Sequence, residues 1–123
     1  MMPFERLDAW KACHQLVLAT YRATDALPVE DGDNLKVYLR RAAILAPAKI
    51  ARGSASRNRG VFRKWVDVAL GYLAEMAYLL HLAVDLEFLP AQSWRELDQL
   101  RGRAAFYAWK LYLSLAPSQR SKD

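Results

Sequence analysis

The sequence predicts an all-α protein, an antiparallel up-and-down four-helix bundle, on the strength of three observations. Alanine and leucine number 20 and 19, whereas valine, isoleucine and threonine together number 11, so helix formers outweigh strand formers. Apolar residues recur at three- and four-residue steps in four segments, as on one face of a helix. Pro28 and Pro90 fall between these segments, and four helices joined by short links favour an antiparallel bundle.

The first two helices are predicted from about residue 7 or 8 to 26 and from about 35 to 51. Asp33 or Asn34 is expected to cap the second helix, since both side chains can accept from free backbone amides. Pro47 lies inside that helix. Its ring removes one backbone hydrogen bond and clashes with the carbonyl four residues earlier, so a kink is expected there.

The last two helices follow a segment that its Gly, Ser and Arg content predicts to be a loop, residues 53–60. Ser56 or Asn58 is expected to cap the third helix, which is the longest and runs from about residue 61 to 86. The fourth begins at Pro90, because proline suits the first turn of a helix, and continues to about Leu115.

Length and composition exclude several protein classes. A single cysteine leaves no internal disulfide framework and no cysteine-rich zinc site. The most apolar stretch, residues 66–84, is interrupted by charged residues, so no membrane span is expected. The first residues lack the pattern of a secretory signal. We expect a cytoplasmic protein with one domain, residues 1–116, and a polar tail, residues 117–123, that is disordered.

The net charge of +5 is unevenly distributed. Nine Lys and Arg and no carboxylate lie between Asn34 and Val66, whereas the rest of the chain holds nine cations and all thirteen acids. Where the second helix ends and the third begins, six cations gather at one end of the predicted bundle: Lys49, Arg52, Arg57, Arg59, Arg63 and Lys64. Those at the start of the third helix are unfavourable beside its positive dipole end, and no acid nearby in sequence relieves them.

This cluster predicts a binding site for an anionic partner, the backbone of RNA or DNA. The alternatives are a patch that is only solvated, or pairing with acids elsewhere, such as those at 30–33 or at 96–98. No recognised nucleic-acid motif is present, so readout of base sequence is not expected.

The third helix is apolar over more of its circumference than a four-helix monomer needs, and the fourth repeats the pattern. This surplus predicts a homo-oligomer, with candidate interface residues Trp65, Tyr72, Leu79, Phe106 and Trp109. The alternative is that the third helix is simply central in a thick bundle. A protein-binding scaffold or adaptor is therefore the second candidate function.

Glu75 lies between the apolar stripes of the third helix. We expect it to pair with an arginine, such as Arg41 or Arg101, across a helix interface. The alternative is a buried acid with a raised pKa that takes part in catalysis.

The remaining reactive side chains are predicted to be structural. His14 and His81 lie on apolar helix faces, as core or interface histidines do, and His81 can pair locally with Asp85. Cys13 is expected to be a small core residue. No nucleophile–base pair, phosphate-binding glycine motif or metal-ligand cluster can be assembled from the sequence, so we expect a non-enzymatic protein without metal or cofactor.

Short motifs also recur in a fixed order and spacing from Phe4 to Leu115: Trp10-Lys11-Ala12, Tyr21, Leu27-Pro28, Leu39-Arg40-Arg41-Ala42, Pro47-Ala48, Ile50-Ala51, Gly53, Phe62, Ala69-Leu70-Gly71, Glu75, Leu82-Ala83 and Asp85-Leu86. Together they resemble the four-helix-bundle family of proteins encoded in intervening sequences of 23S ribosomal RNA genes. The resemblance implies an up-and-down bundle. Members are similar to accessory proteins of diversity-generating retroelements, which form basic homopentameric barrels that bind nucleic acid and a reverse transcriptase, and this implies a homopentamer.

The chain departs from the family pattern at two places. Lys49-Ile50-Ala51-Arg52-Gly53 stands where the family usually has Asn-Ile-Ala-Glu-Gly, and Gly71-Tyr72 stands where it has Gly-Ser. The first departure adds positive charge at two positions. The second adds bulk beside a glycine that would otherwise permit close helix approach. Whatever the Asn and Glu do in relatives is therefore not carried over to Lys49 and Arg52.

Overall fold

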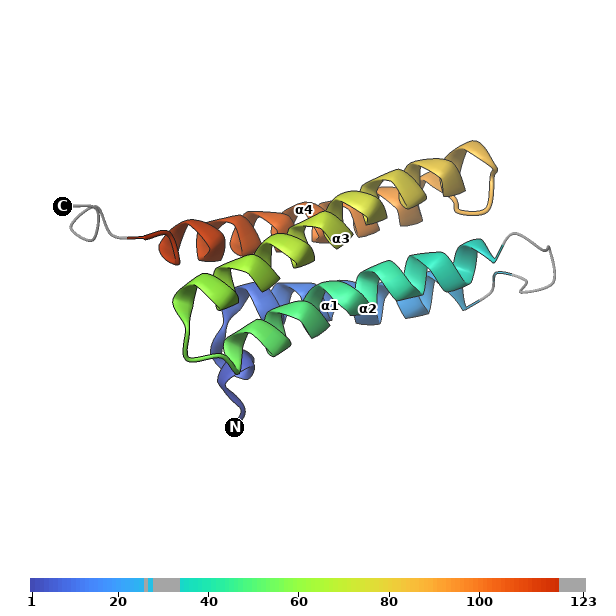
Figure 1. The fold of residues 1–123 in the computed structure, drawn as a ribbon. Coiled ribbons are helices and arrows are strands. Elements are labelled where there is room, and N and C mark those ends of the chain that lie inside the picture. Colours follow the sequence, from blue (N-terminus) through green and yellow to red (C-terminus); the bar gives the residue numbers. More distant parts are fainter. Residues whose placement is uncertain (26, 28–33, 118–123) are drawn as a thin grey trace.

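A computed structural model of the chain shows the predicted antiparallel four-helix bundle (Figure 1). It describes residues 1–25, 27 and 34–117. Helix α1 spans Asp8–Thr24, α2 Leu35–Ser54, α3 Arg59–Asp85 and α4 Ala91–Ser114. A short 3-10 helix, η1 (Pro3–Arg6), precedes α1 and was not expected from the sequence. The all-α fold class is confirmed.

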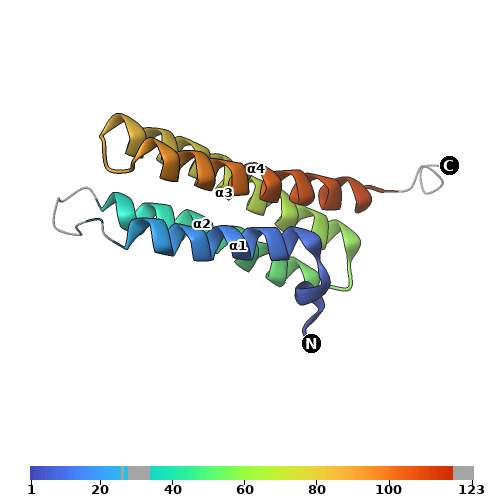
Figure 2. The ribbon, with the colours of Figure 1, turned by 180° about the vertical axis from the view of Figure 1, so that it is seen from behind.

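The helices form two layers, α1 with α2 and α3 with α4, seen from opposite sides in Figures 1 and 2. Each helix packs against its two neighbours in the order α1, α2, α3, α4 and back to α1, so α2 and α4 lie on a diagonal. One end of the bundle therefore collects the starts of α1 and α3 and the ends of α2 and α4. The six cations predicted as a binding site lie at this end.

The core is built from leucines separated by alanines. The fully buried side chains include Leu16 of α1, Leu39 of α2, Leu73 and Leu80 of α3, and many alanines that let the helices approach closely. Each fully buried leucine contributes about 1.5 to 3 kcal/mol. The apolar periodicity of the sequence thus accounts for the packing of all four helices.

The loop between α2 and α3 is shorter than predicted. Helix α2 continues through Ser54 and α3 begins at Arg59, because Asn58 caps α3 by accepting from the amide of Val61 at 3.0 Å. Of the two caps considered for α3, Asn58 is confirmed. Ser56 instead accepts from the amide of Asn58 at 3.1 Å.

The start of α2 differs from expectation in its capping. Asn34 occupies the N-cap position with a left-handed backbone, φ 53°, and its side chain makes no capping hydrogen bond. The prediction that it caps α2 through its side chain is therefore wrong, and the alternative, Asp33, lies outside the described residues. Helix α2 runs on through the buried Pro47, where the kink stays a prediction.

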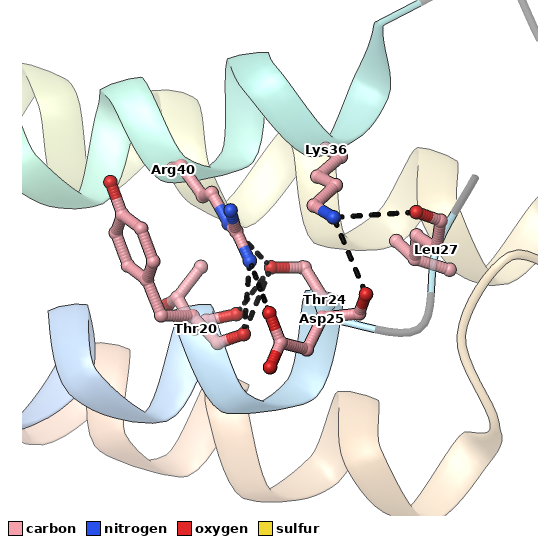
Figure 3. Close-up of polar contacts among 7 residues, drawn as sticks. Thr20, Thr24, Asp25, Leu27, Lys36 and Arg40 are labelled. Carbon is pink, nitrogen blue, oxygen red and sulfur yellow. Dashed lines mark hydrogen bonds and ion pairs between the residues drawn. The ribbon is translucent and has the colours of Figure 1, made fainter. Parts of the chain in front are cut away.

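Cations from α2 cover the end of α1 (Figure 3). The Arg40 guanidinium donates to the Thr24 hydroxyl at 2.9 Å, to the Tyr21 carbonyl at 3.2 Å and to the Asp25 carboxylate at 3.3 Å, and it lies 4.2 Å from the centre of the Tyr21 ring. Lys36 donates to the Asp25 carbonyl at 3.3 Å. Positive charge beside the free carbonyls of a helix end is favourable, so these contacts stabilise the α1–α2 pair.

Among the described helices, α3 alone is long and apolar enough to cross a membrane by length and composition. One such helix is weak evidence, because the core helix of a bundle passes the same test. Here Val66, Leu73 and Leu80 of α3 are buried against the other helices.

Candidate nucleic-acid interface

The α2–α3 junction is held together by a close helix contact at Gly53. A Cβ added there would lie 2.8 Å from the Cβ of Trp65 and 2.9 Å from Cδ1 of Phe62, closer than real Cβ contacts. The end of α2 can therefore pack on the first turns of α3 only with glycine at this position. This contact brings the six predicted cations to one end of the bundle.

Two of the six, Lys49 and Arg52, lie over the indole of Trp65. The Lys49 ammonium is 5.4 Å and the Arg52 guanidinium 4.5 Å from the ring. A cation over an aromatic face gains about 0.5 to 1 kcal/mol at an exposed site. Trp65 is half-buried beneath them and supports the cation cluster at this place. Its role as an interface residue stays a prediction.

Arg59 and Arg63 reach from the start of α3 to the end of α4. Arg59 donates to the Ser114 carbonyl at 2.6 Å, and Arg63 donates to the Tyr112 carbonyl at 3.4 Å while its guanidinium lies 3.9 Å from the Tyr112 ring. The negative end of α4 thus offsets the cost of cations at the positive end of α3. Sequence reasoning missed this contact because 49 to 55 residues separate the partners.

Arg57 and Lys64 are both exposed, and neither makes a hydrogen bond or ion pair with any residue that the structure describes. Lys64 lines an open pocket of about 500 Å³ between the start of α3 and the end of α4, together with Arg59 and Arg63. Asp67 supplies the one carboxylate of that lining. These two cations are the most available to an external anion.

The positive charge extends beyond the α2–α3 junction. We call the basic end the portion of the described chain formed by η1, the first halves of α1 and α3, the second halves of α2 and α4, and the α2–α3 loop (Figure 1). It holds three carboxylates, Glu5, Asp8 and Asp67, against ten cations: Arg6, Lys11, Lys49, Arg52, Arg57, Arg59, Arg63, Lys64, Arg103 and Lys110. The other described residues carry six cations and six carboxylates, so the described charge is concentrated at one end.

Sequence reasoning missed four of those ten cations, Arg6, Lys11, Arg103 and Lys110. The start of α1 and the end of α4 share the basic end only because the bundle is antiparallel. Applying the predicted helix directions to all four helices would have found them.

The predicted oligomer interface is divided by the structure. Phe106 and Trp109 are exposed by 56 % and 49 %, whereas Tyr72 and Leu79 are half-buried against the core. Trp65 is half-buried at the basic end. Only the two α4 residues thus remain largely free for a partner.

Glu75 does not pair as predicted. It is exposed, and no described cation lies within ion-pair distance of its carboxylate. Arg101, one predicted partner, bonds to Asp98 of its own helix at 2.8 Å instead. An exposed position also removes the physical basis of the alternative, a buried catalytic acid.

The other reactive side chains agree only in part with expectation. Cys13 is buried as predicted, and burial raises the pKa of its thiol from 9.0 to about 12. His81 forms the predicted local pair with Asp85 at 3.4 Å, on the surface rather than in a core. His14 is exposed too and stacks on Trp10, with ring centres 4.9 Å apart. Within the described residues no group of three or more His, Cys, Asp or Glu could hold a metal ion.

Comparison with known proteins yields one family. The sequence pattern of the 23S rRNA-intervening sequence proteins matches residues 5–104, from η1 to the middle of α4. No curated protein matches the chain.

Proposed function

We propose that this chain, which belongs to the 23S rRNA-intervening sequence protein family, binds the phosphate backbone of RNA or DNA through its basic end. The observation that carries the proposal is the imbalance of ten cations against three carboxylates there. Lys and Arg that neutralise phosphates release counterions, and this release drives binding that does not depend on sequence. The role proposed is binding, not catalysis.

The cations differ in what they can contribute. Arg59 and Arg63 hold the end of α4, so replacing them would disturb the fold as well as the charge. Arg57 and Lys64 are exposed and make no such contacts in the described chain. They are therefore the residues whose removal tests binding without disturbing the bundle.

The test compares two double variants with equal charge change. Arg57→Gln with Lys64→Gln alters the basic end, and Arg22→Gln with Arg95→Gln removes two exposed cations from the opposite end. Binding of a labelled RNA hairpin and a labelled DNA duplex is followed by fluorescence anisotropy over a range of salt concentrations. The basic-end variant should weaken binding and lower the slope of log K against log salt by about 2, since each phosphate contact contributes about 0.9.

Two results would contradict the proposal. One is wild-type binding that does not change with salt, because backbone binding requires counterion release. The other is an equal loss in the basic-end variant and in the control, which would mean that overall charge, and not this end, sets the affinity.

A second candidate function, a homo-oligomeric scaffold that binds a protein partner, is favoured by the outer face of α4. Phe106, Trp109 and Leu113 are spaced to lie on one helical face and are exposed by 56 %, 49 % and 50 %. Contiguous exposed apolar surface marks interaction sites. The family resemblance is what favours five copies.

Sedimentation velocity over rising protein concentration tests this self-association. Phe106→Gln with Trp109→Gln should weaken it, whereas Leu18→Gln, which alters an exposed apolar residue of α1, should not. A wild-type chain that stays monomeric through the micromolar range would contradict the scaffold function.

A further inference from the structure

The outer face of α2 is apolar and positively charged over its first half. Val37 and Ile44 are exposed by 49 % and 39 %, and they line a groove of about 440 Å³ that also includes Arg40 and Arg41. Arg40 is engaged at the end of α1. Arg41 is exposed and forms no hydrogen bond or ion pair with any described residue.

The outer face of α3 has the opposite charge. From Trp65 to its end at Asp85, α3 holds three carboxylates, Asp67, Glu75 and Asp85, and no Lys or Arg. Glu75 is exposed without a described partner, and Tyr78 is exposed by 63 %. One turn before Glu75, a Cβ added to the exposed Gly71 would meet no atom within 4 Å, so the space beside the helix is open there.

The two faces lie at matching heights along the bundle. Gly53 of α2 sits opposite Phe62 and Trp65 of α3, which fixes the register of the two helices. Arg41 lies twelve residues before Gly53, about 18 Å along the axis, and Glu75 lies ten residues after Trp65, about 15 Å along it. By the same count, Ile44 is level with Gly71 to within about one turn.

We propose that the outer face of α2 in one copy of the chain docks on the outer face of α3 in a second copy. In this interface Arg41 pairs with Glu75 of the second copy, and Ile44 packs over Gly71 of the second copy. The inference rests on the self-association proposed above and adds a contact between α2 and α3 of neighbouring copies to the α4 face proposed there.

Cyclic symmetry would bring these two faces together. Rotation about an axis parallel to the bundle keeps every residue at its own height, so level residues of α2 and α3 meet in neighbouring copies. Because α2 and α3 run in opposite directions, the contact between copies is antiparallel. A cationic, apolar face thus meets an acidic, apolar face.

Charge reversal in separate chains tests the inference. Arg41→Glu and Glu75→Arg each place like charges across the interface and should weaken self-association about tenfold or more in sedimentation velocity. A one-to-one mixture of the two single variants should associate more strongly than either variant alone, because contacts between unlike copies join opposite charges. Recovery is only partial in a ring of five, where two kinds of copy cannot alternate throughout and one like-charged contact remains. The double variant should recover as well. Arg22→Glu, on α1, is the matched control and should leave association unchanged, and circular dichroism confirms that every variant is folded.

The outcomes separate this inference from the self-association on which it rests. Recovery in the double variant but not in the mixture would place the pair within one chain and overturn the inference. Association that neither single variant alters would overturn it too, while leaving self-association intact. A wild-type chain that is monomeric at every concentration would remove both.

Discussion

Replacing Gly53 by alanine should destabilise the bundle, although alanine is the better helix former. The new Cβ would lie 2.8 Å from the Cβ of Trp65, roughly 0.7 Å short of the optimal carbon separation of about 3.5 Å. The neighbouring atoms are a Cβ, a ring carbon and the carbonyl oxygen of Phe62 at 3.2 Å, so the backbones of α2 and α3 must separate. Overpacking of this kind costs about 1 to 3 kcal/mol.

The helix propensity of alanine offsets part of that cost. Alanine gains up to about 1 kcal/mol over glycine inside a helix, and less in the last turn, where Gly53 lies. The net loss should therefore be about 1 to 2 kcal/mol, which lowers the midpoint of thermal unfolding by about 4 to 8 °C in a chain of this size. Urea and thermal unfolding followed by far-ultraviolet circular dichroism measure it.

A matched control separates the contact from the propensity. Gly102 lies within α4, and a Cβ added there would meet no atom within 4 Å, so Gly102→Ala should stabilise the chain by about 0.5 to 1 kcal/mol. Unfolding of Gly53→Ala at the same or a higher urea concentration than the wild type would contradict a close contact at Gly53. A shift of stability in the same direction by both substitutions would contradict it as well.

Two further predictions concern buried and bridging polar groups. Arg40→Gln should lower the free energy of unfolding in urea by about 1 to 2 kcal/mol, because it removes the hydrogen bonds that join α2 to Thr24 and to the end of α1. Arg41→Gln, the control, should lower it by less than about 0.5 kcal/mol in dilute monomeric protein. Equal losses would argue against a stabilising contact of Arg40 with α1. The Cys13 thiol has a pKa raised to about 12, so above pH 9 the unfolded chain loses this proton and the folded chain keeps it. The free energy of unfolding should then decrease as pH rises from about 9 to 12, by at most about 1.4 kcal/mol per pH unit from this group. In the Cys13→Ala variant it should decrease less steeply over that range.

The fold could be predicted from the sequence because each helix carries its own apolar period and its own boundary residues. Asn58 is an example, since an Asn three residues before the Val61 amide is enough to set the start of α3. The failed expectations depend on side-chain direction and local backbone conformation, which the residue pattern does not determine. Glu75 does not pair with an arginine within the described chain, because a position between two apolar stripes does not reveal which way the side chain faces. Asn34 was expected to cap α2 through its side chain, but its left-handed backbone leaves that side chain without a capping bond.

At the candidate site, local sequence predicts the cations, whereas contacts with distant residues decide what each of them does. Positive charge is used in two ways there. At each end of the bundle, cations on one helix cover the last carbonyls of its neighbour. Lys36 and Arg40 of α2 do so for α1, and Arg59 and Arg63 of α3 for α4. Charge used in this way stabilises the bundle and would be present whether or not the protein binds an anion.

The cluster that the sequence predicted as a single site therefore has members of three kinds. Arg59 and Arg63 hold α4, Lys49 and Arg52 lie on Trp65, and Arg57 and Lys64 remain exposed without described partners. A guanidinium has five donors, and Arg59 and Arg63 use few of theirs, so both can still face a phosphate in the pocket that Lys64 also lines. Binding through this end would thus begin with Arg57 and Lys64 and draw on arginines that the fold has already positioned. Substitution of the exposed pair isolates the binding contribution, whereas substitution of all six would mix it with the stability of α4.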